Sequence, residues 1–367
     1  MKRLLTYWMV ITFIVLLSAC VSRVSERSQA LEETSRIDNL SRVSVVAVGD
    51  NLIHNTIYEA AYHNGTYDFR PFYQAIKPFI SAHDLAFINQ ETMLGGVELG
   101  LSSYPSFNSP VEVGEALIDA GFNLFSIANN HTLDRGEQAI INTVEFFWRK
   151  PCVYSGAEIS PNISHLKIFT KNGITFGFIA YTMLTNGQSH PEGKTYLANV
   201  YSREQAMNDL LEAREKVDVL LVSMHWGTEY ESYPDDVQKE EAHFLARLGV
   251  DVIIGHHPHV IQPIEWIETD GHETLVIYSL GNFLSDQKGI DRKIGMAVSF
   301  DLIKANGKKI MIDQVVATLL YHNRTENGLY RVIPYAEVTP EDVPDHEAHQ
   351  MAKAMIIQAY DERIIVR

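Results

Sequence analysis

Five apolar runs that each end in Asp, Glu, Asn or His constrain this sequence more than any other feature. The clearest run, Phe122–Ala128, leads into Asn129-Asn130-His131 and then into a helical pattern that opens at Glu137. The other four runs end at Gly49-Asp50, Asn89-Gln90-Glu91, His225 and His256-His257-Pro258-His259. Side chains at the carboxyl ends of parallel strands meet at one edge of an open α/β sheet, where such folds build their sites. The pattern therefore predicts strands that deliver polar side chains to one place.

These side chains are of the types that bind a divalent metal ion. The candidate ligands are Asp50, Glu91, Asn130, His225, His257 and His259. Carboxylate and amide oxygens combined with imidazole nitrogens, without sulfur, suit Mn, Zn or Fe. Six ligands exceed the four of a tetrahedral zinc site. We therefore expect two divalent ions, roughly 3.5–4 Å apart, that share this set.

Each motif also has a simpler interpretation when it is taken alone. A single histidine at a strand end, such as His225, is more often a hydrogen-bonded residue than a ligand. Asn129-Asn130 is typical of a helix cap, and Asp134 could be a solvated loop acid. His54 and His256 are weaker ligand candidates for the same reason. The coincidence of five similar strand ends is what favours a shared metal site.

The order of the predicted elements indicates the fold class. Helical patterns at 72–83, 110–120 and 137–150 alternate with strands in the first part of the chain. Later segments suit antiparallel strands, namely a hairpin around Asn172-Gly173, whose dipeptide favours a type I′ turn, and alternating apolar runs within 292–335. Parallel strands followed by hairpins predict an α/β fold with mixed sheets.

The N-terminus has the form of an export signal. Lys2 and Arg3 precede an apolar run, Leu4–Leu17, whose 14 residues would make a helix of roughly 21 Å, short of the roughly 30 Å hydrocarbon core. Leu17-Ser18-Ala19-Cys20 resembles a bacterial lipobox, so we expect a signal peptide over 1–19 and lipidation of Cys20. An uncleaved signal anchor is the alternative. Either way we expect an extracytoplasmic protein that is anchored to the cell membrane, by lipid if Cys20 is acylated.

The rest of the domain organisation follows from composition. Residues 20–42 are polar and predict a tether, 43–335 form the main domain, and 336–367 form a C-terminal helical extension. A formal net charge of −16 argues against a nucleic-acid partner. Cys152 is the second of two cysteines, so a lipidated Cys20 leaves no partner for a disulfide.

The motifs resemble those of the CapA-type capsule-synthesis family, which is similar to calcineurin-like metallophosphoesterases. The matching segments lie between residues 43 and 290 in the order of the family: Gly49-Asp50, Asn89-Gln90-Glu91, Ala128–Gly136, His225–Tyr230, His257–Val260 and Tyr278–Phe283. The resemblance implies an αββα sandwich in which helices flank two mixed β-sheets. It departs from the phosphoesterases at the opening motif, because Gly-Asp stands where they have Asp-x-His, and Glu91 stands where they have Asp.

The resemblance also implies roles for single residues. Asn130 matches the metal-binding asparagine and His131 the substrate-facing histidine. His225 matches the isolated histidine ligand, His257 and His259 the closing pair, and Asp50 and Glu91 the two carboxylates. We expect four further residues to contact substrate: His54, Asn129, Glu229 and Asn282.

These assignments lead to a functional hypothesis. We expect a membrane-anchored, metal-dependent hydrolase that cleaves amide bonds, or less readily phosphoester bonds, in an anionic cell-envelope polymer such as poly-γ-glutamate. His131, steered by Asp134, would protonate the leaving group. One alternative is a non-catalytic subunit that anchors or exports polymer together with capsule synthase subunits. Another is a metallophosphodiesterase.

Overall fold

The computed structural model describes residues 40–305 and 309–367. The predicted signal peptide, Cys20 and nearly all of the predicted tether therefore lie outside the described residues. The first strand begins at Leu40, three residues before the predicted start of the main domain. Across the described ranges, no helix combines the length and the apolar character that a membrane crossing requires.

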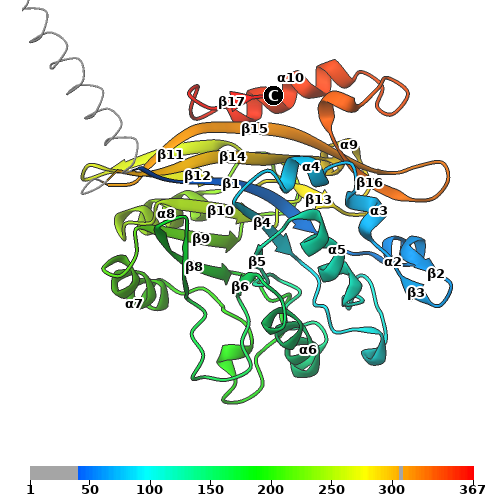
Figure 1. The fold of residues 1–367 in the computed structure, drawn as a ribbon, viewed down its shortest axis with the longest axis horizontal. Coiled ribbons are helices and arrows are strands. Elements are labelled where there is room, and N and C mark those ends of the chain that lie inside the picture. The colour runs from blue at the N-terminus through cyan, green and yellow to red at the C-terminus, as the bar shows by residue number, and fades with distance from the viewer. Residues whose placement is uncertain (1–39, 306–308) are drawn as a thin grey trace, which may run out of the picture.

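Two mixed β-sheets form the centre of the molecule (Figure 1). The first sheet has the order β16-β15-β14-β1-β4-β5-β6, with β13 beside β1 and β17 beside β15. Its strands are β1 (Leu40–Asn51), β4 (Leu85–Gln90), β5 (Leu124–Ser126), β6 (Val153–Ser155), β13 (Asn282–Leu284), β14 (Ile294–Ala305), β15 (Met311–Arg324), β16 (Tyr330–Pro334) and β17 (Ile365–Val366). Within it β1 runs parallel to β4 and antiparallel to β14.

The second sheet has the order β11-β12-β10-β9-β8-β7. Its strands are β7 (Lys167–Lys171), β8 (Ile174–Thr182), β9 (Val219–His225), β10 (Val252–His256), β11 (Ile264–Thr269) and β12 (His272–Ile277). The central strands β8, β9 and β10 are parallel, and hairpins add β7 and β11 at the edges. A separate small hairpin joins β2 (Tyr62–His63) to β3 (Thr66–Tyr67).

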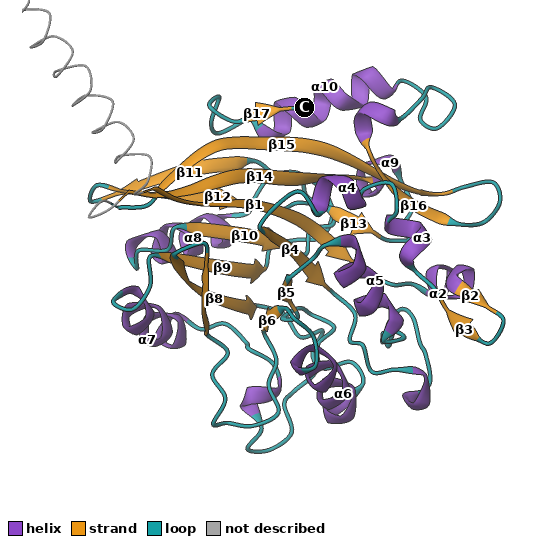
Figure 2. Ribbon diagram, viewed as in Figure 1, coloured by secondary structure: helices purple, strands orange, loops and turns teal. Residues whose placement is uncertain are grey.

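Helices cover the parts of both sheets that the facing sheet leaves free (Figure 2). They are α2 (Asn55–Ala61), α3 (Arg70–Tyr73), α4 (Lys77–Ile80), α5 (Glu112–Ala120), α6 (Gly136–Trp148), α7 (Arg203–Arg214), α8 (Asp236–Arg247), α9 (Ile290–Lys293) and α10 (His346–Ile357). Residues of α7 and α8 pack on the second sheet, and those of α3, α5 and α6 pack on the first. The predicted α/β class, with two mixed sheets flanked by helices, is confirmed.

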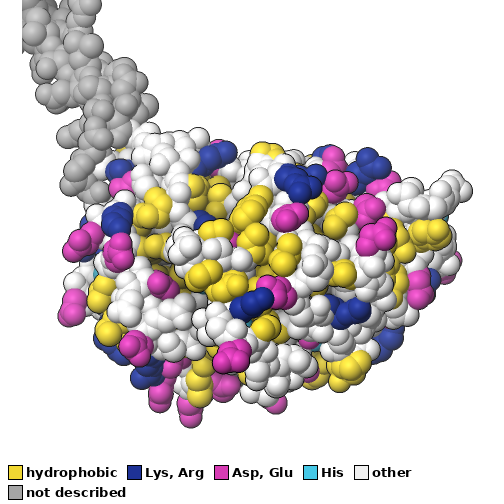
Figure 3. Space-filling model, turned by 90° about the horizontal axis from the view of Figure 1, so that it is seen from below, with side chains coloured by type: hydrophobic (Ala, Val, Ile, Leu, Met, Phe, Trp, Pro, Cys, Tyr) yellow, Lys and Arg dark blue, Asp and Glu magenta, His cyan; other side chains and the backbone are white. Residues whose placement is uncertain are grey.

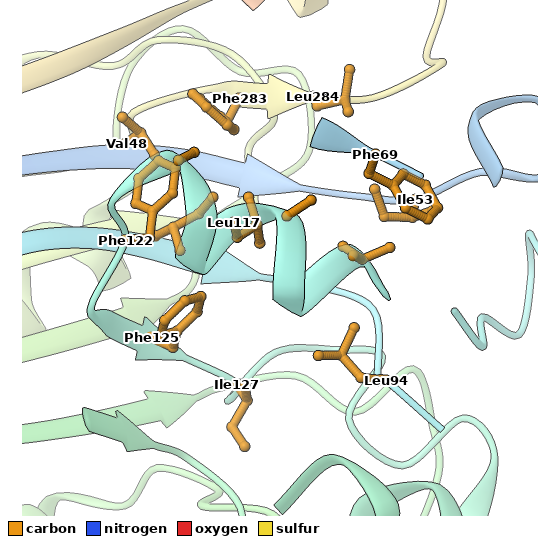
Figure 4. Close-up of a cluster of buried hydrophobic side chains, with 14 of the residues drawn as sticks. Val48, Ile53, Phe69, Leu94, Leu117, Phe122, Phe125, Ile127, Phe283 and Leu284 are labelled. Carbon is orange, nitrogen blue, oxygen red and sulfur yellow. The ribbon is translucent and has the colours of Figure 1, made fainter. Parts of the chain in front are cut away.

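Three hydrophobic clusters hold these layers together. Between the sheets, Phe87 of β4 packs edge-on against Phe178 of β8, with ring centroids 6.0 Å apart. On the outer face of the first sheet, Val48, Leu117 and Phe125 belong to the cluster drawn in Figure 4. Burying one such side chain contributes about 1.5–3 kcal/mol. The clusters therefore fix the strand ends that carry the site.

Two local predictions have different outcomes. The hairpin is confirmed, because β7 and β8 are joined by Asn172 and Gly173, whose φ angles are 46° and 79°. The single helix predicted over 72–83 is wrong, because the chain forms the two short helices α3 and α4, each with a proline in its first turn. Pro78 lacks the N–H that a continuous helix needs, so a new helix starts there.

The C-terminal segment is tied to the first sheet. Figure 1 shows α10 lying over β15, and β17 pairs with β15 in parallel. Ile357 and Ile364 belong to the same buried cluster as Ala317 of β15. The predicted helical extension thus includes a short strand and supplies core side chains.

Acidic and basic side chains are interspersed on the molecular surface. The face in Figure 3 mixes both kinds with hydrophobic side chains. The net charge of −16 is therefore not gathered into one acidic field on that face.

Candidate metal centre

The carboxyl ends of strands from both sheets meet at one place. β1 and β4 are paired in parallel so that Asp50 lies beside Asn89, and β9 and β10 are paired so that His225 lies beside His256. Figure 1 shows β4, β8 and β9 pointing to the same side of the molecule. The first sheet thus brings carboxylates and the second sheet brings imidazoles.

Three buried side chains form a compact group of possible ligands. One ligand atom each of Glu91, His257 and His259 lies within 4.8 Å of the other two. His225 Nε2 lies 3.9 Å from Glu91 Oε1 and 3.0 Å from Asn130 Oδ1. Five of the six predicted ligands, Glu91 included, therefore lie in one group.

The environment of Glu91 fits a cation. Its side chain is completely buried, yet neither carboxylate oxygen has a hydrogen-bond partner among the described residues. Burial raises the pKa of Glu91 well above its ordinary value, and the charge of Asp50 raises this pKa further, against a lowering by His259. A buried carboxylate without a partner is costly, and a divalent ion held with imidazole nitrogens would remove that cost.

The sixth predicted ligand, Asp50, contacts the same histidine from its other ring nitrogen. Asp50 Oδ2 lies 3.2 Å from His259 Nδ1, whereas Glu91 Oε1 lies 3.7 Å from His259 Nε2. Asp50 Oδ1 lies 3.3 Å from His256 Nδ1 and accepts a 2.8 Å hydrogen bond from Asn89. Burial alone would raise the pKa of Asp50, but the contacts with His256 and His259 hold it well below its usual range.

The histidines differ in their affinity for protons. Burial tends to lower the pKa of His259, but the charges of Glu91 and Asp50 outweigh it and raise this pKa to about 9. Burial lowers the pKa of His257 to about 3, helped by the charge of His259. A metal ligand must be deprotonated, so an ion at this site would have to displace a proton from His259.

The turn that carries the closing histidines has an uncommon backbone. His257 and His259 have φ angles of 97° and 61°, in the left-handed region. Such conformations cost of order 1–3 kcal/mol each and cluster at functional sites. The amide of His257 lies 3.3 Å from Asp50 Oδ2, and Tyr230 N donates to Pro258 O at 2.8 Å, so contacts on both sides hold the turn.

A histidine–aspartate pair lies beside the metal candidates. His131 Nδ1 is 2.7 Å from Asp134 Oδ2, and Asp134 also accepts a 2.7 Å hydrogen bond from the amide of Phe107. The Phe107 ring packs edge-on against His131, with centroids 4.6 Å apart. These contacts fix the imidazole, and the carboxylate favours a proton on Nδ1.

A cavity of about 500 Å³ connects this pair with the metal candidates. Asn130, His131, Asp134 and His259 all line it. Of the four residues predicted to contact substrate, His54 and Glu229 also line it, and Asn129 and Asn282 do not.

Asn129 and Asn282 have internal contacts instead. Asn129 is completely buried, and its Oδ1 accepts a 2.9 Å hydrogen bond from the amide of His131. Asn282 Oδ1 lies 3.0 Å from His259 Nδ1. Both asparagines orient a histidine of the site, because their side chains are held inside the fold.

The sequence-based reasoning missed several residues of the cavity wall. They are Leu52, Tyr104, Pro105, Ser106, Phe107, Asn186, Gln188, Tyr230 and Gln287. Asn186 Nδ2 lies 3.4 Å from His131 Nδ1. Tyr104, Phe107, Asn186 and Gln188 come from two long Gly- and Ser-containing segments, 93–109 and 182–195. Such long loops are a signal of a binding site.

Comparison with known proteins identifies relatives of this chain. A family model described as bacterial capsule synthesis protein PGA_cap matches residues 44–287. The PGA biosynthesis protein CapA of Bacillus subtilis is 31% identical over 198 residues, which cover 53% of this chain and 50% of that protein. The capsule biosynthesis protein CapA of Bacillus anthracis is 26% identical over 302 residues, which cover 78% of this chain and 70% of that protein. The match thus spans about half the length of the Bacillus subtilis relative.

Solved structures with some similarity include two nucleotidases. The NAD nucleotidase of Haemophilus influenzae has a TM-score of 0.49 and 12% identity, covering 89% of this chain and 64% of that chain. A 5′-nucleotidase precursor from Thermus thermophilus has a TM-score of 0.47 and 14% identity, covering 86% of this chain and 58% of that chain.

Proposed function

We propose that this chain, which belongs to the bacterial capsule synthesis protein family PGA_cap, is a divalent-metal-dependent hydrolase of amide bonds in a cell-envelope polymer. The proposal depends mainly on the buried Glu91 carboxylate, which has no hydrogen-bond partner among the described residues. Glu91 lies with His257 and His259 beside the cavity. The polymer we propose is a poly-glutamate, because relatives are named for PGA biosynthesis and for capsule biosynthesis.

The lining of the cavity supports amide over phosphoester cleavage. None of the described residues that line it is Lys or Arg, the side chains that usually pair with phosphate groups. Side-chain amides such as Asn186 and Gln287 take those places, and an amide group matches the donors and acceptors of a peptide-like chain. A phosphodiesterase remains the alternative outcome of the assay below.

Glu91, His257 and His259 would hold the ion, with His225 and Asn130 next to them. We propose Mn, Zn or Fe, because the donors are oxygen and nitrogen. A bound ion supplies Lewis-acid chemistry that polarises the bond to be cleaved. A second ion stays a prediction from the sequence; Asp50 contacts Nδ1 of His259 at 3.2 Å, on the side of the ring away from Glu91, and would hold this histidine in orientation for the first ion.

The protein side chains would handle the leaving group. His131 would protonate the departing nitrogen, and Asp134 would hold the ring through the 2.7 Å contact to Nδ1. A positioned general acid of this kind contributes about 10²–10⁴-fold to the rate.

We also propose, from residues 1–42 alone, that the protein is exported and anchored in the membrane through a lipidated Cys20. A Cys20→Ser variant should then fail to incorporate labelled fatty acid in the producing cell. Labelling of that variant at the level of the wild type would contradict the anchor.

The function is tested with the full-length protein, poly-γ-glutamate and bis-p-nitrophenyl phosphate. Metal analysis should find bound divalent ion, and Mn or Zn should support the release of amino groups from the polymer. Absence of both bound metal and hydrolysis would contradict the proposal. Cleavage of the phosphodiester alone would replace the amide substrate by a phosphoester, and capsule output unaffected by His131→Ala would favour a non-catalytic subunit.

A further inference from the structure

Two carboxylates flank the Nε2 atom of His259 in different surroundings. Glu91 Oε1 lies 3.7 Å away on a side chain that is completely buried. Glu229 Oε1 lies 4.0 Å away on a side chain that is 43% exposed and lines the cavity. Paired carboxylates in unlike environments commonly have different chemical roles. The buried one fits the cation, so the exposed one is free for another task.

The backbone holds Glu229 in this position. Two residues before it, Gly227 has a φ of 83°, and a Cβ there would lie 2.4 Å from Gln238 Oε1. Directly after it, Tyr230 has a φ of 69°, and its amide donates to Pro258 O at 2.8 Å. This contact links the segment to the turn that carries the closing histidines. The carboxylate is therefore presented by a constrained segment, and local strain of this kind is typical of functional sites.

Glu229 lies beside the ligand group without belonging to it. The mutual 4.8 Å group contains Glu91, His257 and His259, and Glu229 is not part of it. A separation of 4.0 Å between Glu229 Oε1 and His259 Nε2 is too long for a direct hydrogen bond. The cavity that Glu229 lines has a volume of about 500 Å³ and therefore has room for a water molecule beside this carboxylate.

The Asp50 carboxylate, at the opposite end of the site, is not among the described residues that line the cavity. Leu52, two residues after Asp50, lines the cavity with an apolar side chain. The Asp50 oxygens are already in contact with His256, His259 and Asn89. Glu229 is therefore a carboxylate that faces the cavity and has room for water beside the ligand group.

We propose that Glu229 is a catalytic residue that accepts the proton of the attacking water, a role that rests on the hydrolase function proposed above. The water oxygen forms a bond to the amide carbon while one of its protons passes to the Glu229 carboxylate. The C–N bond then breaks, and the electron pair stays on nitrogen, which takes a proton from His131. The products are a carboxylic acid and an amine, and the proton on Glu229 restores His131 through solvent.

The test compares Glu229→Gln with Glu231→Gln in the full-length protein. Gln keeps the size of the side chain but cannot accept the proton. Glu231 lies on the same segment, is exposed and does not line the cavity, so it controls for the loss of one charge. With poly-γ-glutamate and Mn or Zn, we expect Glu229→Gln to lower kcat by about 10²-fold or more with KM unchanged, and Glu231→Gln to behave as the wild type.

Metal content and affinity, measured by elemental analysis and chelator competition, provide a readout that does not depend on activity. Both variants should bind the ion like the wild type. Loss of the ion in Glu229→Gln would make Glu229 a ligand and overturn the proposal, as would an unchanged kcat. If the wild type itself hydrolyses nothing, the proposed hydrolase function fails and the role of Glu229 fails with it. If the wild type is active and Glu229→Gln is equally active, only the role of Glu229 is contradicted.

Discussion

Replacing Glu91 by Gln should stabilise the metal-free protein and destabilise the metal-loaded protein relative to the wild type. The Glu91 carboxylate is buried and has no hydrogen-bond partner among the described residues. Burial raises the pKa of Glu91, so the folded protein binds a proton there more tightly than the unfolded chain does. The stability from this proton is present below the ordinary pKa of glutamate and is lost as the pH rises through the raised pKa.

The magnitude follows from the cost of an unpaired buried group. Such a group costs about 1–3 kcal/mol, and more when it is charged, but Gln also loses the attraction to His259, which lies 3.7 Å away. We expect the free energy of unfolding of the metal-free variant to exceed that of the wild type by about 1 kcal/mol. A difference of 1 kcal/mol shifts Tm by about 2–4 °C in domains of 150–250 residues. A ligand at a hundred times its Kd stabilises the folded protein by about 2.7 kcal/mol. The Glu91→Gln variant should lose most of this stabilisation by bound metal.

Thermal unfolding near neutral pH, with EDTA or with saturating Mn or Zn, measures both effects. The two curves should exchange order when metal is added. Glu158→Gln is the matched control, because Glu158 is also buried but forms an ion pair with Lys167, so its replacement should destabilise both forms. A Glu91→Gln protein that is less stable than the wild type in EDTA, or that keeps the full metal-induced shift, would refute this reasoning.

Three further predictions concern protons, catalysis and packing. Metal affinity should increase with pH, because the ion displaces a proton from His259, whose pKa is raised to about 9; titration calorimetry in two buffers measures the released proton, and an affinity independent of pH would contradict this. Asp134→Asn should lower kcat by about 10²-fold or more without loss of metal, because His131 loses the carboxylate 2.7 Å from its Nδ1; unchanged steady-state kinetics would count against the pair. Gly49→Ala should destabilise the fold by about 3 kcal/mol or more, because its Cβ would lie 1.8 Å from Gly281 O; denaturant unfolding with a wild-type midpoint would show this to be wrong.

The sequence could predict which strand ends meet. A strand that ends in a polar side chain places it at the edge of the sheet, so the positions of Asp50, Glu91 and His225 follow from local pattern. The approach of Asn130 to His225, 3.0 Å apart, follows from the stacking of two sheets. That stacking could be expected only from the resemblance to a known family.

The sequence could not predict which groups share one ion. Asp50 and Glu91 have similar local patterns, yet they contact opposite ring nitrogens of His259, because side-chain orientation depends on tertiary packing. The left-handed backbone at His257 is likewise imposed by its surroundings. Asn186 could not be assigned to the cavity, because a loop sequence does not specify which wall the loop forms. The break between α3 and α4, by contrast, could have been predicted from the sequence, because Pro78 is incompatible with a continuous helix.

The donor atoms of the site come from two different β-sheets, so their positions depend on how the core between these sheets is packed. Phe87 stacks on His256, with ring centroids 5.4 Å apart, and it also packs against Phe178 of the facing sheet. Because interiors are closely packed and transmit strain, a change of volume at Phe87 would tilt the imidazole that adjoins Asp50. The distance between the two sheets thus sets the positions of the donor atoms relative to one another. The sizes of the core residues between the sheets therefore affect the geometry of the site at the sheet edges.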